Sequence, residues 1–202
     1  MSVKNPIISV TGSSGAGTST VKHTFQQIFR RESVSAATIE GDAFHKYDRA
    51  SMKKELEKRS GQGDLTFSHF SYDANLLNEL EKCFIDYSES GKCKYRHYVH
   101  NAEEAGEYGA EPGTFTDWKE FSDKSDLLFY EGLHGAVVND EVNLAKHADL
   151  KIGVVPVINL EWIQKIHRDR DSRGYSTEAV TDTILRRMHA YVHCICPQFT
   201  ET

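Results

Sequence analysis

The stretch from residue 6 to residue 20, PIISVTGSSGAGTST, constrains the fold more than any other part of this sequence. It begins with a short apolar run that contains β-branched residues, which is typical of a buried strand. Three glycines follow in a loop with little side chain, and beyond Ser19 apolar residues recur at the spacing of one helical face. A strand, a glycine-rich loop and a helix in this order predict a loop that binds phosphate.

The spacing of the glycines supports this prediction. Four residues separate Gly12 from Gly17, which leaves Ser19 where a hydroxyl could hold Mg²⁺. Inward-turned amides and the positive end of the helix dipole would cradle a triphosphate. The predicted ATP-binding residues are Gly12, Ser13, Ser14, Gly15, Ala16, Gly17, Thr18, Ser19 and Thr20. The alternative is a glycine-rich turn that closes a strand–helix unit and binds nothing.

Thr18 departs from the usual motif, because it occupies the position at which such loops normally carry lysine. Another part of the chain must therefore supply a cation to the terminal phosphates.

The composition narrows the class of protein. A chain of 202 residues is most simply one domain, which buries about 70% of its unfolded surface. Its formal charge of −6 argues against a general nucleic-acid binder, and it has neither a long apolar run nor a signal peptide's apolar core. Its four cysteines lack zinc-type spacing and are expected to be reduced. We expect a cytoplasmic protein with no membrane or nucleic-acid partner.

The pattern of the remaining chain predicts an α/β fold. Three more strands are expected, over residues 34–40, 126–130 and 150–158. Helices are expected over residues 50–59, 74–87, 160–170 and 177–192. Apolar strands that alternate with helices imply a mostly parallel sheet flanked by helices on both faces. Residues 101–113 are acidic and contain glycine, which favours an exposed loop or hairpin.

Two acids follow strands at the edge where such sheets bind ligands. Glu131 stands where phosphate-loop enzymes keep a carboxylate for Mg²⁺, and Asp42 ends another strand. Either acid alone could be a helix cap or a surface carboxylate. Together, beside a phosphate loop, they indicate catalysis, with Asp42 as the candidate base.

The chain turns basic after Asp42. His45, Arg49 and Lys53 are spaced four residues apart and would form one stripe if this segment is helical. Such a stripe would suit a phosphorylated acceptor. The alternative is a solvated face on which Lys53 pairs with Glu57.

Residues 60–118 hold much of the aromatic and histidine content and are predicted to be an insertion that lines the acceptor pocket, although most such residues simply pack. Tyr98 and His100 lie in an alternating run, which would place both side chains on one face of a strand.

The segment over residues 165–178, KIHRDRDSRGYSTE, is densely charged and lacks apolar periodicity beyond its first turn. In kinases with a phosphate loop, an arginine-rich turn of this kind closes over the nucleotide and stabilises the transferring phosphoryl group. Lys165, Arg168 and Arg173 are therefore candidates for the cation that Thr18 does not supply. The alternative is a charged helix end followed by a turn at Gly174.

This segment, K-I-x-R-D-x3-R-G-x-S-x-E, resembles the signature of the phosphoribulokinase family. The segments GSSGAGTST, EGDAFH at residues 40–45 and FYEGLHG at residues 129–135 resemble its bacterial branch, in the same order along essentially the whole chain. The resemblance implies a fold like that of adenylate kinase and ATP-dependent phosphorylation of D-ribulose 5-phosphate to ribulose 1,5-bisphosphate in the Calvin cycle.

The resemblance also implies roles for individual residues. Asp42 would be the base, and Asp169 a second essential acid that works with Mg²⁺. Contacts to the sugar phosphate would come from His45, Arg49 and Lys53, and contacts to the transferring phosphate from Lys165, Arg168 and Arg173. Ser19, Glu131 and Asp169 are then the candidate metal ligands. Members of this branch are oligomers and often respond to NADH, and the candidate effector residues are Arg31, Arg186 and Arg187.

Two features depart from the family pattern. Ala16 occupies the position of a regulatory cysteine in plant members, so thiol switching through this loop is not expected. The sequence stops at Thr202, before the further strands of bacterial members, which suggests a fragment or a shortened form. Two other functions fit the nucleotide half: a uridine-type or pantothenate-type kinase, whose acceptor carries no phosphate, and a nucleotide-binding regulator without transfer activity.

Overall fold

The computed structural model describes residues 4–121 and 124–202, without the side chains of residues 172 and 173. Its centre is a parallel sheet of four strands in the order β2-β5-β1-β6. The strands are β1 (Ile7–Thr11), β2 (Ala36–Glu40), β5 (Leu127–Gly132) and β6 (Leu150–Gly153). The predicted parallel sheet is confirmed.

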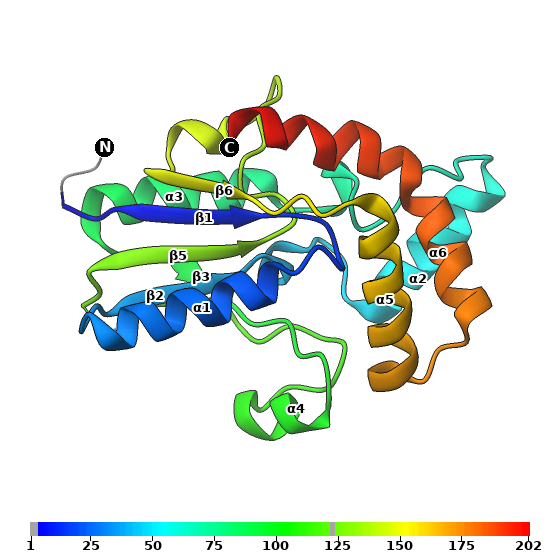
Figure 1. The fold of residues 1–202 in the computed structure, drawn as a ribbon, viewed down its shortest axis with the longest axis horizontal. Coiled ribbons are helices and arrows are strands. Elements are labelled where there is room, and N and C mark those ends of the chain that lie inside the picture. Colours follow the sequence, from blue (N-terminus) through cyan, green and yellow to red (C-terminus); the bar gives the residue numbers. More distant parts are fainter. Residues whose placement is uncertain (1–3, 122–123) are drawn as a thin grey trace.

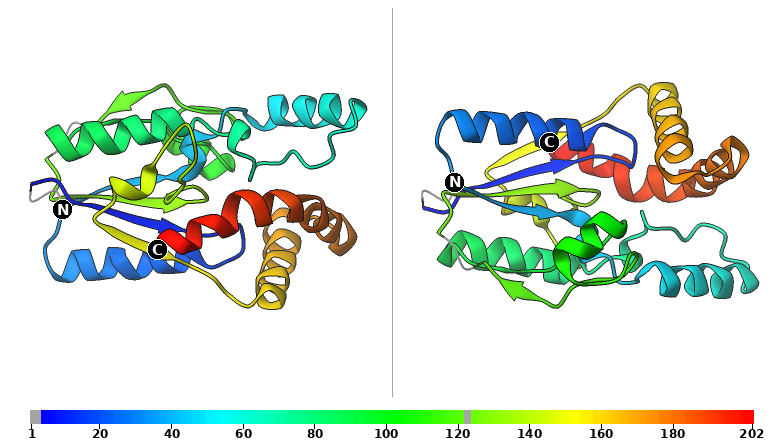
Figure 2. Two further views of the ribbon diagram at one scale, coloured as in Figure 1. Left: turned by 90° about the horizontal axis from the view of Figure 1, so that it is seen from above. Right: turned by 90° about the horizontal axis from the view of Figure 1, so that it is seen from below.

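Helices cover both faces of this sheet, as Figures 1 and 2 show. Helix α1 (Thr18–Arg31) lies on one face, where its Phe29 ring meets Phe129 of β5 at 5.7 Å between ring centroids. Helix α3 (Leu77–Ser90) lies on the other, where Phe84 meets Tyr130 at 5.5 Å. Neighbouring residues of β5 thus pack into opposite halves of the core, as the alternation of a strand requires.

The remaining elements connect the strands or follow the last of them, β6. They are a 3₁₀ turn (Gly41–Phe44), α2 (Arg49–Gly61), a second 3₁₀ turn (Tyr72–Ala74), a ribbon of β3 (Lys94–Tyr95) and β4 (Lys119–Glu120), α4 (Ala102–Tyr108), a third 3₁₀ turn (Leu144–Lys146), α5 (Ile158–Arg173) and α6 (Thr177–Ala190). The chain then continues as a π turn (Tyr191–Ile195) and a 3₁₀ helix (Cys196–Glu201). Among these elements, α2, α5 and α6 lie beyond the carboxyl ends of the strands (Figure 1).

Three expectations about these elements were wrong. The strand expected over residues 150–158 ends at Gly153, because Pro156 cannot donate to a ladder and α5 begins at Ile158. The loop expected over residues 101–113 contains α4, whose first turn is capped by Asn101 accepting from the Glu104 amide. The arginine-rich turn expected within residues 165–178 is helical up to Arg173, because α5 extends beyond the helix expected over residues 160–170. Gly174 then ends the helix, as the alternative of a charged helix end predicts.

The last turn of the chain is fixed against the sheet by Gln198, which is 1% exposed. Its amide nitrogen donates to the Leu133 carbonyl at 2.9 Å, and its oxygen accepts from the Ala136 amide at 3.1 Å. These bonds hold the loop that follows β5. All four cysteines are free thiols, as expected. Within residues 4–121 and 124–202, no helix is long and apolar enough to cross a membrane.

Candidate active site

The phosphate loop connects β1 to α1 and depends on two glycines in the left-handed region. Gly15 has a φ of +111° and Gly17, which precedes the first turn of α1, a φ of +99°. Gly12 is required by crowding, since a Cβ there would lie 2.9 Å from the Val154 carbonyl oxygen. The sequence therefore builds the loop that its glycine spacing predicts.

Helix α5 packs directly on this loop. A Cβ on Gly15 would lie 3.1 Å from Cβ of Lys165, and the Ser13 hydroxyl donates to the Glu161 carboxylate. Arg168 donates from its guanidinium to the Ser14 hydroxyl at 3.0 Å. The loop that lacks the usual lysine is thus in contact with two cationic residues, Lys165 and Arg168, of a helix far along the sequence.

The buried face of α5 is charged rather than apolar. Glu161, Lys165 and Asp169 are 7%, 5% and 5% exposed and lie four residues apart on one stripe. Lys165 Nζ donates to one oxygen of Asp169 at 2.7 Å, and Arg168 Nε donates to the other at 3.0 Å. Burying charges without partners is costly, so a paired stripe aimed at a phosphate loop indicates a ligand-binding function.

Burial sets the charge behaviour of this stripe. It lowers the pKa of Lys165 to about 8, helped by Arg187 and opposed by Asp169. Burial alone would raise the pKa of Asp169, but its bonds from Lys165 and Arg168 outweigh burial and lower the pKa. Burial raises the pKa of Glu161.

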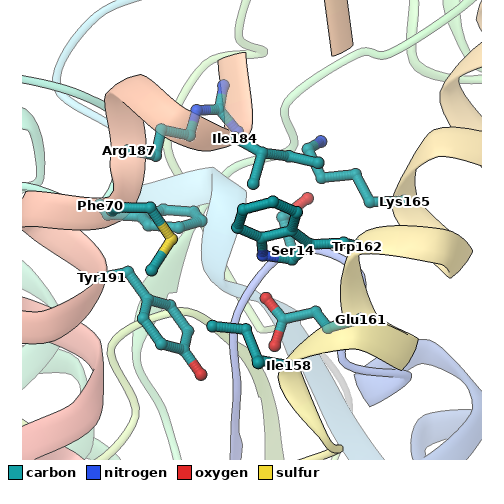
Figure 3. Close-up of a pocket in the computed structure, with 10 residues that line it drawn as sticks. Ser14, Phe70, Ile158, Glu161, Trp162, Lys165, Ile184, Arg187 and Tyr191 are labelled. Atoms are coloured by element: carbon teal, nitrogen blue, oxygen red, sulfur yellow. The ribbon is translucent and has the colours of Figure 1, made fainter. Parts of the chain in front are cut away.

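Figure 3 shows the pocket between α5, α6 and the loop, in which Lys165 and Arg187 approach from opposite sides above Trp162. The pocket is lined by Ser14, Phe70, Ile158, Glu161, Trp162, Lys165, Ile184, Arg187, Met188 and Tyr191.

Glu131 at the end of β5 fits the predicted magnesium role. It is hydrogen-bonded to Thr18, and burial raises its pKa, with the charges of Glu40 and Asp42 acting in the same direction. A carboxylate in such negative surroundings favours a bound cation. Among the residues described, no group of three or more His, Cys, Asp or Glu side chains could hold a metal. Mg²⁺ usually binds one or two carboxylates together with phosphate oxygens and water.

The other two candidate metal ligands differ in their surroundings. Ser19 is exposed in the first turn of α1, beside Thr18. Asp169 has an oxygen committed to each of two cations. A direct bond to Mg²⁺ would require Asp169 to give up one of them.

Asp42 lies in the 3₁₀ turn after β2, between two imidazole rings. His45 Nε2 is 3.1 Å from its Oδ1, and His100 Nε2 is 3.0 Å from its Oδ2. Burial would raise the pKa of Asp42, but the charge of His45 and the hydrogen bond from His100 outweigh burial and hold the pKa well below its usual range. Asp42 is therefore ionised at neutral pH, as a base must be.

His100 reaches Asp42 from the segment that precedes α4. Its Nδ1 lies 3.0 Å from Glu104 Oε2, and the pKa of His100 is raised by the hydrogen bond to Asp42, despite burial. The Tyr98 ring packs against the His100 ring at 4.9 Å, so the two side chains meet as expected, although Tyr98 forms only an isolated bridge with Phe115 and no regular strand.

The predicted stripe on α2 does not exist as one helical face, because His45 precedes the helix and Asp48 caps it. His45 is 8% exposed and faces Asp42. Arg49 donates to the His100 carbonyl at 3.0 Å, which brings it to the same site. Lys53 is exposed one turn further along α2.

The three predicted effector arginines do not gather. Arg31 is the last residue of α1, and the C-terminal end of this helix lies on the opposite side of the molecule from α6 (Figure 1). Arg186 is exposed on α6 and pairs with Asp182. Arg187 instead lines the pocket beside Lys165. Arg173 ends α5, but its side chain lies outside the described part of the chain.

Four residues of the site were missed from the sequence. Glu161 had a detectable signal, because it continues the four-residue spacing of Lys165 and Asp169 one turn earlier. Asn75 and Arg96 had none, because they reach His45 and Ala43 through contacts between segments that are distant in the sequence. Glu104 had a local signal, since it stands on α4 four residues after His100 and three after the N-cap Asn101.

The chain is similar to known proteins along almost its whole length. A model of the Phosphoribulokinase / Uridine kinase family matches residues 7–202. The chain is 71% identical over its 202 residues to phosphoribulokinase 1 of Cereibacter sphaeroides, of which it spans 70%. It is 66% identical over 199 residues, 98% of the chain, to phosphoribulokinase of Nitrobacter vulgaris, of which it spans 69%.

A solved structure of phosphoribulokinase from Rhodobacter spheroides has a TM-score of 0.85 and 68% identity, over 98% of this chain and 68% of that one. The resemblance seen in the sequence motifs is therefore confirmed. The chain belongs to the phosphoribulokinase/uridine kinase family, and it is a kinase with a phosphate loop that uses ATP and Mg²⁺ to phosphorylate an alcohol acceptor.

Proposed function

We propose that this chain transfers the γ-phosphoryl group of ATP to D-ribulose 5-phosphate, giving ribulose 1,5-bisphosphate for carbon fixation in the Calvin cycle, with Asp42 as the base. The observation that carries the proposal is an ionised carboxylate held by two imidazoles, 3.1 and 3.0 Å away, at the sheet edge that also holds the phosphate loop. Relatives named phosphoribulokinase, at 71% and 66% identity, support the same acceptor.

In the proposed reaction, Asp42 accepts the proton of the acceptor hydroxyl as the oxygen attacks the γ-phosphorus and the bond to ADP breaks. Both carboxylate oxygens already accept from histidines, so the substrate hydroxyl must share one of them. His100 is the partner expected to move, because its side chain is 29% exposed, whereas that of His45 is 10% exposed.

The charged face of α5 supplies the electrostatic stabilisation of the transferring phosphoryl group. Lys165 and Arg168 lie against the loop and would stabilise the negative charge that spreads over the transferring group. Asp169 orients both cations through its two oxygens. Mg²⁺, bound near Glu131, would neutralise charge on the phosphates.

Three cationic residues around Asp42, namely His45, Arg49 and His100, favour an acceptor that carries phosphate. His45 and His100 have raised pKa values, and Arg49 lies beside His100. In His45 burial acts in the opposite direction and the charge of Asp42 overcomes it. Uridine offers no anion to these cations, and pantothenate offers a carboxylate but no phosphate, so the cations favour a sugar phosphate over either alternative acceptor.

The test is ADP release with MgATP and ribulose 5-phosphate, uridine, pantothenate or no acceptor in parallel. Release that depends on ribulose 5-phosphate alone is the expected result. Release with uridine or pantothenate instead would replace the proposed acceptor. Release with no acceptor, in a folded chain that binds ATP, would indicate a nucleotide-binding protein whose hydrolysis is uncoupled from transfer.

The proposal extends to assembly and regulation. The family resemblance supports a cytoplasmic homo-oligomer that responds to NADH through Arg31, Arg186 or Arg187. Light scattering measures the assembly, and a monomer would contradict the proposed oligomer. Initial rates at varied ATP concentration, with and without NADH, measure the response, and unchanged rates would contradict the proposed effector. Because Arg187 lines the pocket of Lys165, its replacement is expected to alter turnover, unlike that of Arg31.

A further inference from the structure

Behind the Asp42–His45 pair lies a buried amide, Asn75, which is 9% exposed and follows the second 3₁₀ turn. The backbones of Asn75 and His45 form an antiparallel bridge, in which Lys46 donates to Ala74 at 2.9 Å and Leu76 donates to Phe44 at 2.7 Å. This pairing fixes the two side chains opposite one another. Asn75 Oδ1 lies 2.8 Å from His45 Nδ1.

Only one orientation of this amide satisfies its surroundings. Asn75 Nδ2 donates to the His69 carbonyl at 2.9 Å and to the Ser71 carbonyl at 2.8 Å. A flipped amide would place its oxygen against two acceptors. The oxygen must therefore face His45, and His45 Nδ1 must carry a proton to donate to it.

The other ring nitrogen of His45 is fixed by Asp42. An ionised carboxylate only accepts, so Nε2, 3.1 Å from Asp42 Oδ1, must also carry a proton. A ring that is protonated on both nitrogens is an imidazolium. We propose that Asn75 is a positioning residue of the acceptor site, whose fixed carboxamide keeps His45 protonated on both nitrogens and so keeps it a cation paired with Asp42.

The other groups that face His45 are compatible with this charge. Burial lowers the pKa of His69 to about 3, with Arg187 and His45 adding to the effect, and burial next to His45 lowers the pKa of His134 to about 3. Both rings are thus neutral. Burial raises the pKa of Tyr98, whose ring lies 6.3 Å from that of His45, so Tyr98 is neutral too. Arg187 opposes the charge on His45, whereas Asp42 and Asn75 favour it.

The arrangement differs from that of the second histidine on Asp42. His100 is backed by the carboxylate of Glu104, in a segment that is partly exposed. His45 is backed by a neutral amide in a buried bridge. The charge on His45 therefore adds to the attraction for an anionic acceptor, while Asp42 remains the only carboxylate with a hydrogen bond to that ring among the contacts described for it.

A histidine ¹⁵N NMR titration of the whole chain tests the proposal directly. The chain contains ten histidines, and a His45→Gln spectrum assigns the ring in question. We expect both nitrogens of His45 to be protonated at neutral pH, with a titration midpoint above the ordinary 6.5. A midpoint at or below 6.5 in the parent chain overturns the proposal without any variant.

The variant is Asn75→Leu, which keeps the size of the side chain and removes the acceptor. It is expected to move the midpoint of His45 to lower pH. The control is Ser71→Ala, which removes the hydroxyl that accepts from the Ser68 amide at 3.0 Å in the same turn, without a contact to His45. An unchanged midpoint in Asn75→Leu, or an equal shift in Ser71→Ala, contradicts the proposal.

A kinetic measurement gives the second readout, and this part alone rests on the proposed function. In Asn75→Leu, kcat/KM for ribulose 5-phosphate should begin to fall at a lower pH than in the parent chain. At pH 8 it should be about tenfold below the parental value, and KM for MgATP should be unchanged. A uniform loss with no movement of the alkaline limb would indicate a merely structural role. If the parent chain does not use ribulose 5-phosphate, the proposed function fails, and the NMR titration still decides the role of Asn75.

Discussion

The nucleotide half of the site stands on regular elements, whereas the acceptor half is made of loops joined by hydrogen bonds. The phosphate loop lies between β1 and α1, and the cations that serve it lie on one face of α5. Asp42, by contrast, is reached by His45 three residues away and by His100 58 residues away. Regular elements fix positions through local geometry, but each loop contact depends on tertiary structure.

The difference predicts how each half fails. A change on α5 should leave the loop folded and alter the transfer step. A change among the loop contacts should alter both the acceptor affinity and the local stability.

The largest effect is expected from Asp42→Asn. It removes the base without touching the phosphate loop, so turnover should fall by about 10³ or more while ATP binding stays nearly intact. Single-turnover kinetics and ATP titration measure the two quantities. Asp86→Asn, on the exposed side of α3 where Asp86 pairs with Lys82, is the control and should be neutral. Full turnover in Asp42→Asn would eliminate Asp42 as the base.

The next effect concerns the charged stripe of α5. Because the pKa of Lys165 is about 8, the ammonium is present below that pH and is lost above it, so kcat should decline as pH rises through about 8. Lys165→Met should lose about 10² in kcat, and Lys165→Arg should be slower than the parent but lack this alkaline limb. Lys58→Met, on the exposed side of α2, should show the parental profile. The same limb in Lys165→Arg would assign it to another group.

Arg49 and Lys53 provide a graded test within the acceptor half. Arg49→Ala should raise KM for ribulose 5-phosphate by about tenfold, since Arg49 is held at the site by the His100 carbonyl. Lys53→Ala should have a smaller effect, because that side chain is exposed. Initial-rate kinetics with each substrate varied in turn separate an effect on ribulose 5-phosphate binding from an effect on ATP binding. A change confined to the ATP dependence would mean that the cations serve the other ligand.

The smallest effect on the chemistry, and the clearest on stability, is expected from Arg96→Ala. Arg96 donates to the Ala43 carbonyl at 2.8 Å and to the His45 carbonyl at 2.7 Å, so it holds the turn that carries Asp42. The guanidinium carbon of Arg96 also lies 3.6 Å from the centroid of the Phe115 ring.

Loss of these contacts should reduce the free energy of unfolding by about 3 kcal/mol. Thermal and urea denaturation measure it. Arg96→Lys cannot bridge both carbonyls in the same way and should have an intermediate stability. Arg30→Ala, at an exposed position of α1, should cost less than about 0.5 kcal/mol. Equal stability of Arg96→Ala and the parent would show that the turn holds without this side chain.

The same contrast explains what the sequence could predict. The phosphate loop, the parallel strands and the position of Glu131 and Asp42 at one edge follow from spacing and strand periodicity, which are local properties. The end of β6 was misjudged and α4 was not predicted, because short segments are decided by single residues, here Pro156 and Asn101. The helix expected over residues 160–170 was found, but its charged end, which continues to Arg173, was interpreted as a turn because the buried stripe faces a ligand site and so lacks apolar residues.

The contacts of the acceptor half could not be predicted in this way. Nothing in the local sequence of Asn75 or Arg96 indicates that either side chain reaches the turn after β2. The predicted stripe of His45, Arg49 and Lys53 assumed one helix, but Asp48 caps α2 after His45. His45 and Arg49 nevertheless both approach Asp42 or its partner His100.

The central claim is that the two halves act on one pair of substrates, and ³¹P NMR of the reaction mixture tests it most directly. The chain is incubated with MgATP and ribulose 5-phosphate, and the Asp42→Asn variant is treated identically. We expect equal amounts of ADP and ribulose bisphosphate with the parent chain and a loss of both with the variant. ADP and inorganic phosphate without bisphosphate, or bisphosphate formed equally well by Asp42→Asn, would contradict it.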